Sequence, residues 1–191
     1  MNVVAFNGSA RRDGNTAILL RQVLAELERD GIGTELVQLA GTRLSGCTAC
    51  LKCVEAGDMT CAVKNDVLNT CVQKMVTADG ILIGSPVYFA DATATTKALI
   101  ERAGMVTRVN DRALRRKVGA AVVAVRRGGA VHSFDSINHF FQISEMVIVG
   151  STYWNLGVGE PIGAVLQDEE GLQTMRVLGQ NMSWVLQKLH G

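Results

Sequence analysis

Apolar residues gather along this chain in short unbroken runs, separated by longer segments in which they recur at helical spacing. The runs are rich in β-branched residues and end at Gly, Pro or polar residues, as is typical of buried strands. They predict five strands, at residues 2–8, 34–40, 80–86, 118–125 and 146–153. The second run alternates more than the others, so we expect it near an edge of the sheet.

The intervening segments predict helices. In residues 15–30 the apolar side chains Ile18, Val23 and Leu27 fall on one face with their neighbours, and the sequence DGIG ends the pattern. The same reasoning predicts helices at residues 66–77, with Asp66 as a candidate cap, and at residues 92–103, 130–145 and 168–189.

Strands that are apolar throughout must be covered on both faces, and regular alternation with helices implies a parallel sheet with right-handed crossovers. The pattern therefore predicts a doubly wound α/β domain. No linker or repeat interrupts it, so residues 1–191 are predicted to form a single domain with a cysteine-rich insert at about residues 46–62.

Composition narrows the functional classes. The chain has 191 residues, of which 48% are apolar and 19% charged, with a net charge of +1. These values suit one globular core, and they favour neither a nucleic-acid nor a membrane partner. No apolar run is long enough to span a bilayer, and the first residues do not resemble a signal peptide, so we expect a cytoplasmic protein with reduced thiols.

The loop after the first strand, GSARRDGNT (residues 8–16), is the first candidate ligand site. Ligands of such folds bind at the carboxyl ends of the strands, and the start of the following helix favours a phosphate. Ser9, Asn15 and Thr16 supply donors there and Arg11 supplies positive charge. The loop lacks the spacings of dinucleotide and nucleoside-triphosphate loops. The alternative is an ordinary capped turn with solvated arginines.

This loop resembles the phosphate loop of the NADPH-dependent FMN reductase-like branch of flavodoxin-like proteins, which typically reads G-S-x-R-x-x-G-N-T. The sequence SPVYF after the third strand is similar to the S-P-x-Y-x of the same family. The resemblance extends from residue 2 to about residue 189. It implies a five-stranded flavodoxin-like sheet of order 2-1-3-4-5, FMN as cofactor, NAD(P)H as transient co-substrate, and a homodimer or homotetramer.

The resemblance also implies which residues meet the flavin ring, namely Pro86, Val87, Tyr88 and Phe89. A flat apolar ring needs apolar or aromatic surface beside it and backbone donors at its polar edge, which these residues can supply.

The loop after the fourth strand would also contact the ring. Gly128 lets backbone approach a ligand closely, and Arg126 or Arg127 could place positive charge near the pyrimidine edge of the flavin. Solvated surface arginines beside a turn are an equal alternative.

Four cysteines lie close together in the insert: two residues separate Cys47 from Cys50 and Cys50 from Cys53, and seven residues separate Cys53 from Cys61. The spacing is similar to the compact motif of iron–sulfur flavoproteins, a subgroup of this family in which four cysteines hold a [4Fe–4S] cluster beside FMN. Free thiols, a thiol–disulfide pair or structural zinc are the alternatives, and the tandem spacing disfavours zinc. Cys71, on a predicted helix, is expected to be a buried free cysteine.

The sequence thus predicts an FMN-dependent oxidoreductase that passes electrons from NAD(P)H or a reduced carrier to a small acceptor such as a quinone or flavin. The chemistry would occur at N5 of the flavin, and His132, His139 and His190 show no catalytic or ligand spacing. Trp154 could wall the substrate side or pack at a dimer contact. The rival is a flavin or iron–sulfur electron carrier that exchanges electrons with a ferredoxin-like protein, although such carriers tend to be acidic.

Overall fold

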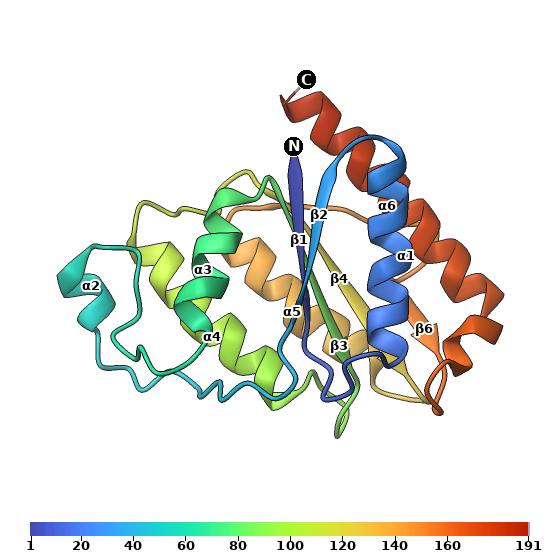
Figure 1. The fold of residues 1–191 in the computed structure, drawn as a ribbon, viewed down its shortest axis with the longest axis horizontal. Helices are drawn as coiled ribbons and strands as arrows, with labels where there is room; N and C mark the ends of the chain where they lie inside the picture. The colour runs from blue at the N-terminus through green and yellow to red at the C-terminus, as the bar shows by residue number, and fades with distance from the viewer. Residues whose placement is uncertain (191) are drawn as a thin grey trace.

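The structure is a computed structural model and describes residues 1–190. It contains one parallel sheet in the order β2-β1-β3-β4-β5, with a further short strand, β6, paired to β4 (Figure 1). The order confirms the predicted doubly wound, flavodoxin-like architecture. The strands are β1 (Asn2–Asn7), β2 (Gly33–Gln38), β3 (Gly80–Pro86), β4 (Val118–Val125), β5 (Val147–Ile148) and β6 (Leu156–Val158).

Helices cover both faces of the sheet. On one face lie α1 (Asn15–Arg29) and α6 (Glu169–His190), and on the other lie α3 (Leu68–Thr77), α4 (Ala94–Val109) and α5 (Ala130–Ile143). Helix α4 runs six residues beyond its predicted end. The pattern did not predict the short helix α2 (Lys52–Ala56) or the 3-10 turn η1 (Ala164–Gln167), because each is too short to show a periodicity.

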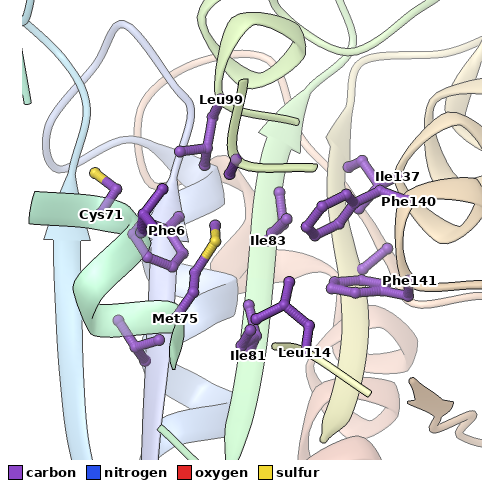
Figure 2. Close-up of a cluster of buried hydrophobic side chains, with 14 of the residues drawn as sticks. Phe6, Cys71, Met75, Ile81, Ile83, Leu99, Leu114, Ile137, Phe140 and Phe141 are labelled. Carbon is purple, nitrogen blue, oxygen red and sulfur yellow. The ribbon is translucent and has the colours of Figure 1, made fainter. Parts of the chain in front are cut away.

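Each face of the sheet has its own apolar core. Figure 2 shows the core beneath α3, α4 and α5, where Phe6 and Ile83 of the sheet meet Met75, Phe140 and Phe141. All five are 3% exposed or less. The central strands contribute alternate side chains to the two cores, so both faces of the sheet are packed.

The predicted fifth strand, residues 146–153, is wrong in its extent. Strand β5 pairs with Val118 and Gly119, and pairing with β4 resumes only when Leu156 meets Val123. Between these points β4 advances four residues, whereas the outer chain uses eight. The extra residues loop out at the sheet edge, where a side chain can remain exposed and an apolar run need not be a continuous strand.

Residues 39–67 leave the sheet between β2 and α3 and carry α2, which lies against α4 (Figure 1). This segment contains the clustered cysteines. Within residues 1–190, no helix is both long enough and apolar enough to cross a membrane.

Candidate functional site

The loop after β1 is held from beneath by a buried amide. Asn7 Nδ2 donates to Gln38 Oε1 of β2 at 2.6 Å, and Asn7 Oδ1 accepts from the backbone N–H of Ser9 at 3.1 Å. Gln38 Nε2 donates in turn to the Ser9 carbonyl at 3.1 Å. Two strands therefore fix the position of Ser9, which is 3% exposed.

Helix α1 begins at this loop without an acidic residue in its first turn and without a side-chain cap. The first N–H groups of a helix have no intrahelical partner, so this helix start is a favourable place for an anion. Thr16 lies in the first turn and is 1% exposed. Its Oγ1 is buried with no hydrogen-bond partner among the described residues, and such a hydroxyl is costly unless a ligand satisfies it.

Asn15 is tied to the segment that follows β6. Its Nδ2 donates to the carbonyls of Gly159 and Pro161 at 3.0 and 2.9 Å, and its Oδ1 accepts from Gly163 N–H at 2.9 Å. Arg11 Nη1 also donates to the Glu160 carbonyl, at 3.3 Å. Asn15 thus ties the chain beyond β6 to the loop after β1.

These loops enclose a cavity of about 160 Å³ at the carboxyl ends of β1, β3 and β4. Eight of the ten predicted flavin-site residues line it: Ser9, Arg11, Asn15, Thr16, Pro86, Val87, Tyr88 and Arg126. Sequence reasoning missed three lining residues, Ala124, Gly159 and Glu160. The apolar end of β4 could have indicated Ala124, whereas no motif indicated the residues after β6.

Phe89 does not line the cavity. It occupies a tight turn in which Tyr88 and Asp91 exchange backbone hydrogen bonds of 2.8 and 3.1 Å, with φ of 48° at Phe89 and 66° at Ala90. Two positive φ angles are typical of a type I′ turn, which turns the chain sharply. The turn leaves the Phe89 side chain fully exposed, at 105% of its reference area.

Gly128 does not line the cavity either, and a Cβ added there would meet nothing within 4 Å. The neighbouring Gly129 is the constrained position. It has φ of 89°, and an added Cβ would lie 2.8 Å from Ala90 Cα. Gly129 therefore brings the loop after β4 against the turn after β3.

Charged side chains border the cavity. Arg126 Nε lies 3.1 Å from Glu160 Oε2, and both side chains are more than half exposed. An exposed pair of this kind is weak and readily exchanged for a ligand, so Arg126 can turn toward a bound anion.

The clustered cysteines form a second cavity, of about 260 Å³, between the insert and α4. Cys47, Cys50, Cys53 and Cys61 all line it, so the structure brings together every predicted metal ligand. The remaining lining includes Ala49, Leu51, Met105 and Val106, and it is largely apolar. A small loop with four thiols on one cavity is the donor set that an iron–sulfur cluster requires.

All the cysteines are free thiols in the structure. The N–H of Lys52 lowers the pKa of the Cys50 thiol, whereas burial raises the pKa of Cys53. Cys71, which packs in the core beneath α3, is 1% exposed, and burial raises its pKa to about 11. The prediction of a buried free cysteine at Cys71 is confirmed.

Across residues 1–190, no three Cys, His, Asp or Glu side chains are grouped tightly enough to hold a single metal ion. His132 lies 3.7 Å from Asp91 in an exposed pair. Trp154 packs edge-on against Tyr153, with ring centroids 4.7 Å apart, in the loop that interrupts the edge strand, and it does not line the cavity at the carboxyl ends of β1, β3 and β4.

Comparison with known proteins identifies the family. The sequence model described as NADPH-dependent FMN reductase matches residues 1–160. The chain belongs to this family. Members of the FMN reductase family are FMN-dependent flavoproteins, and this coarse function agrees with the prediction from the phosphate loop.

Relatives extend over the whole length of this FMN reductase family member. An iron–sulfur flavoprotein from Methanocaldococcus jannaschii is 38% identical over 193 residues, covering 97% of each chain. One from Methanosarcina thermophila is 30% identical, covering 98% of this chain and 96% of its own. The crystal structure of RosB with a bound riboflavin-phosphate intermediate superposes with a TM-score of 0.74 at 18% identity, covering 99% of this chain and 80% of that one. This last likeness shows the shared fold.

Proposed function

We propose that this protein is an FMN-dependent oxidoreductase that passes electrons from NAD(P)H or a reduced carrier to a small acceptor. The observation that carries the proposal is the unpartnered hydroxyl of Thr16, buried at the start of α1 in the cavity between β1 and β3. A phosphate monoester placed there would accept hydrogen bonds from Thr16, from Ser9 and from the helix start, with Arg11 adding charge.

The other end of the cavity suits the ring of FMN. Pro86, Val87 and Ala124 supply apolar surface, Tyr88 supplies an aromatic face, and Arg126 stands at the rim. When bound, FMN supplies the redox chemistry and exchanges one or two electrons. The protein residues bind and orient the nucleotide, and none of them needs to act as a general acid or base.

We further propose that Cys47, Cys50, Cys53 and Cys61 hold a [4Fe–4S] cluster. Two facts support this: the four thiols share one cavity, and relatives at 38% and 30% identity carry the name iron–sulfur flavoprotein. The tandem spacing of Cys47, Cys50 and Cys53 also favours a cluster over structural zinc, whose sites usually pair two separate cysteine knuckles.

Helix α4 begins at Ala94, shortly after the turn that follows β3, and its residue Arg102 lines the cysteine cavity. The assembly of subunits into a homodimer or homotetramer stays a prediction from the family resemblance.

Anaerobic turnover tests this function. With NADH or NADPH and a quinone or free flavin as acceptor, we expect the bound flavin to bleach and the acceptor to be reduced catalytically. Free FMN at the same concentration, without protein, is the control for background reduction. An absence of turnover together with fast electron exchange with a ferredoxin would contradict the enzyme and identify a carrier.

A further inference from the structure

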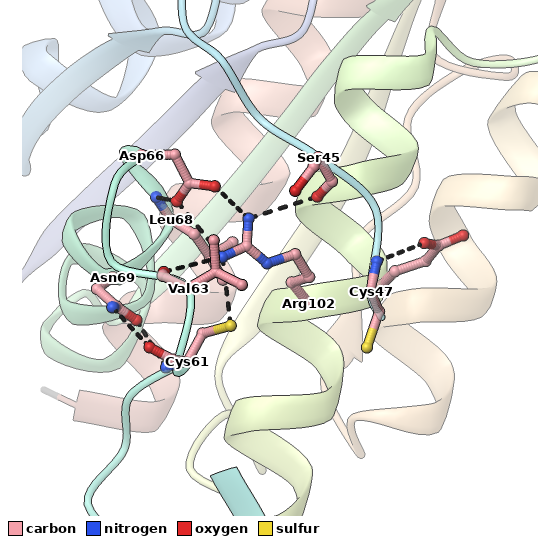
Figure 3. Close-up of polar contacts among 9 residues, drawn as sticks. Ser45, Cys47, Cys61, Val63, Asp66, Leu68, Asn69 and Arg102 are labelled. Atoms are coloured by element: carbon pink, nitrogen blue, oxygen red, sulfur yellow. Dashed lines mark hydrogen bonds and ion pairs between the residues drawn. The ribbon is translucent and has the colours of Figure 1, made fainter. Parts of the chain in front are cut away.

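Arg102 is the largest fully buried side chain in the protein, with 1% of its side chain exposed. It projects from α4 into the wall of the cysteine cavity (Figure 3). Buried arginines are rare and must be paired, and Asp66 provides the pair through Oδ2 and Nη1. Asp66 is itself 3% exposed along its side chain.

The guanidinium joins both ends of the cysteine segment. Nη1 donates to the Ser45 carbonyl at 3.4 Å, just before Cys47, and Nη2 donates to the Val63 carbonyl at 3.1 Å, just after Cys61. Nη2 also donates to the Cys61 sulfur at 3.2 Å. The planar guanidinium therefore holds both ends of the cysteine segment and orients the Cys61 thiol (Figure 3).

Among the described residues, Arg102 places a positively charged donor against a cysteine sulfur of the cavity. Cys47, by contrast, has a carboxylate beside it, since its backbone N–H donates to Glu101 Oε2 at 3.2 Å. Hydrogen bonds to ligand sulfurs are among the factors that set the potential of an iron–sulfur centre. A charged N–H donor in a poorly hydrated site stabilises a ligand sulfur more when the bound centre carries one extra electron.

We propose that Arg102 is a positioning residue that orients Cys61 and raises the reduction potential of the centre held by the four cysteines. Asp66 moderates this effect, because its carboxylate offsets the charge of the guanidinium. The inference rests on the proposed cluster.

The test compares reduction potentials among variants that remove the buried pair, change its donor or remove its carboxylate alone. In the double variant Asp66→Asn/Arg102→Met, the amide oxygen can still accept from Leu68 N–H, as Asp66 Oδ1 does at 3.0 Å, and no lone charge is buried. Arg102→Lys keeps the positive charge but loses the planar guanidinium and its several hydrogen bonds. Asp66→Asn alone keeps the donor and removes the opposing carboxylate. Arg108→Met is the matched control, since Arg108 is an exposed arginine of the same helix that contacts the Ile143 carbonyl.

Each protein is purified anaerobically, its iron and sulfide are measured, and its centre is titrated with EPR detection. At the wild-type midpoint potential, we expect the ratio of reduced to oxidised centre to be about tenfold lower in the double variant. This corresponds to a midpoint potential that is lower by about 59 mV for one electron. The ratio should fall less in Arg102→Lys, rise in Asp66→Asn and stay unchanged in Arg108→Met. If the double variant loses its iron, the other two variants carry the test by their opposite shifts.

Two results would overturn the inference, and they are distinguishable. Equal iron content with unchanged potentials in all variants would contradict the role of Arg102 and leave the proposed cluster intact. A wild-type protein that contains flavin but no iron or sulfide would contradict the cluster and the inference together.

Discussion

Replacing Asp66 with asparagine is expected to lower the free energy of unfolding by about 3–5 kcal/mol, because the change leaves the Arg102 guanidinium buried without its counter-charge. Both side chains are at most 3% exposed, so water cannot replace the lost carboxylate. Asparagine has nearly the same shape and can still accept from Leu68 N–H, so the effect isolates the charge. Chemical denaturation of the protein as purified measures it.

The exposed pair between Lys74 and Glu35 is the matched control. Its charged atoms lie 2.7 Å apart, but its side chains are 33% and 52% exposed. Glu35→Gln should therefore cost about 1 kcal/mol or less. Equal losses in Asp66→Asn and Glu35→Gln would show that the buried pair has no special role in holding the cysteine segment.

Replacing Gly8 with alanine is expected to have the largest effect on the flavin cavity. The added methyl group would overlap Thr96 Oγ1 and approach the Gly84 carbonyl at 3.1 Å. Gly8 N–H donates to that carbonyl at 2.8 Å, and the Gly8 carbonyl accepts from Thr93 Oγ1 at 2.8 Å, so the loop cannot move aside without losing these bonds. We expect a loss of stability of about 1–3 kcal/mol.

The same substitution should weaken FMN binding by about tenfold or more, because Ser9 is displaced together with Gly8. Fluorescence quenching of added FMN measures the affinity. The double variant Gly8→Ala/Thr96→Ala lacks the overlapping hydroxyl. It should therefore lose less stability and less FMN affinity than the two single variants lose together. Strictly additive losses would mean that the overlap does not constrain the loop. Gly128→Ala is the control, since its Cβ would meet nothing within 4 Å.

Much of the fold could be predicted because the central strands are apolar throughout, and only a sheet covered on both faces buries such strands. The ends of β3 and β4 fall where the pattern places them, at Pro86 and Val125. The edge strand could not be predicted in the same way. Its residues Val147 and Ile148 are exposed, at 38% and 41%, so an apolar run there does not indicate a strand that pairs with β4 along its whole length.

The cavity at the carboxyl ends of β1, β3 and β4 was predictable where a short motif supplies its lining residues. Three contributions arise from long-range contacts that a motif cannot show. Asn15 is engaged by the segment after β6, the exposure of Phe89 depends on a turn with two positive φ angles, and Gly129 is constrained by Ala90. The cysteines were evident from their spacing. The buried arginine that contacts Cys61 comes from α4, about 40 residues further along the chain, and nothing in the helical pattern around it distinguished it from a surface arginine.

Binding of FMN and of riboflavin to the flavin-free protein tests the central claim most directly, because the two ligands differ only in the phosphate. Two charge-assisted hydrogen bonds are each worth about 1.5–3 kcal/mol, so FMN should bind about 100-fold or more tightly than riboflavin. Thr16→Val should weaken FMN binding about tenfold or more and leave riboflavin binding unchanged. The flavin-free variant should be at least as stable as wild type, since it loses a buried hydroxyl without a partner. Equal affinities for FMN and riboflavin in the wild-type protein would contradict the account.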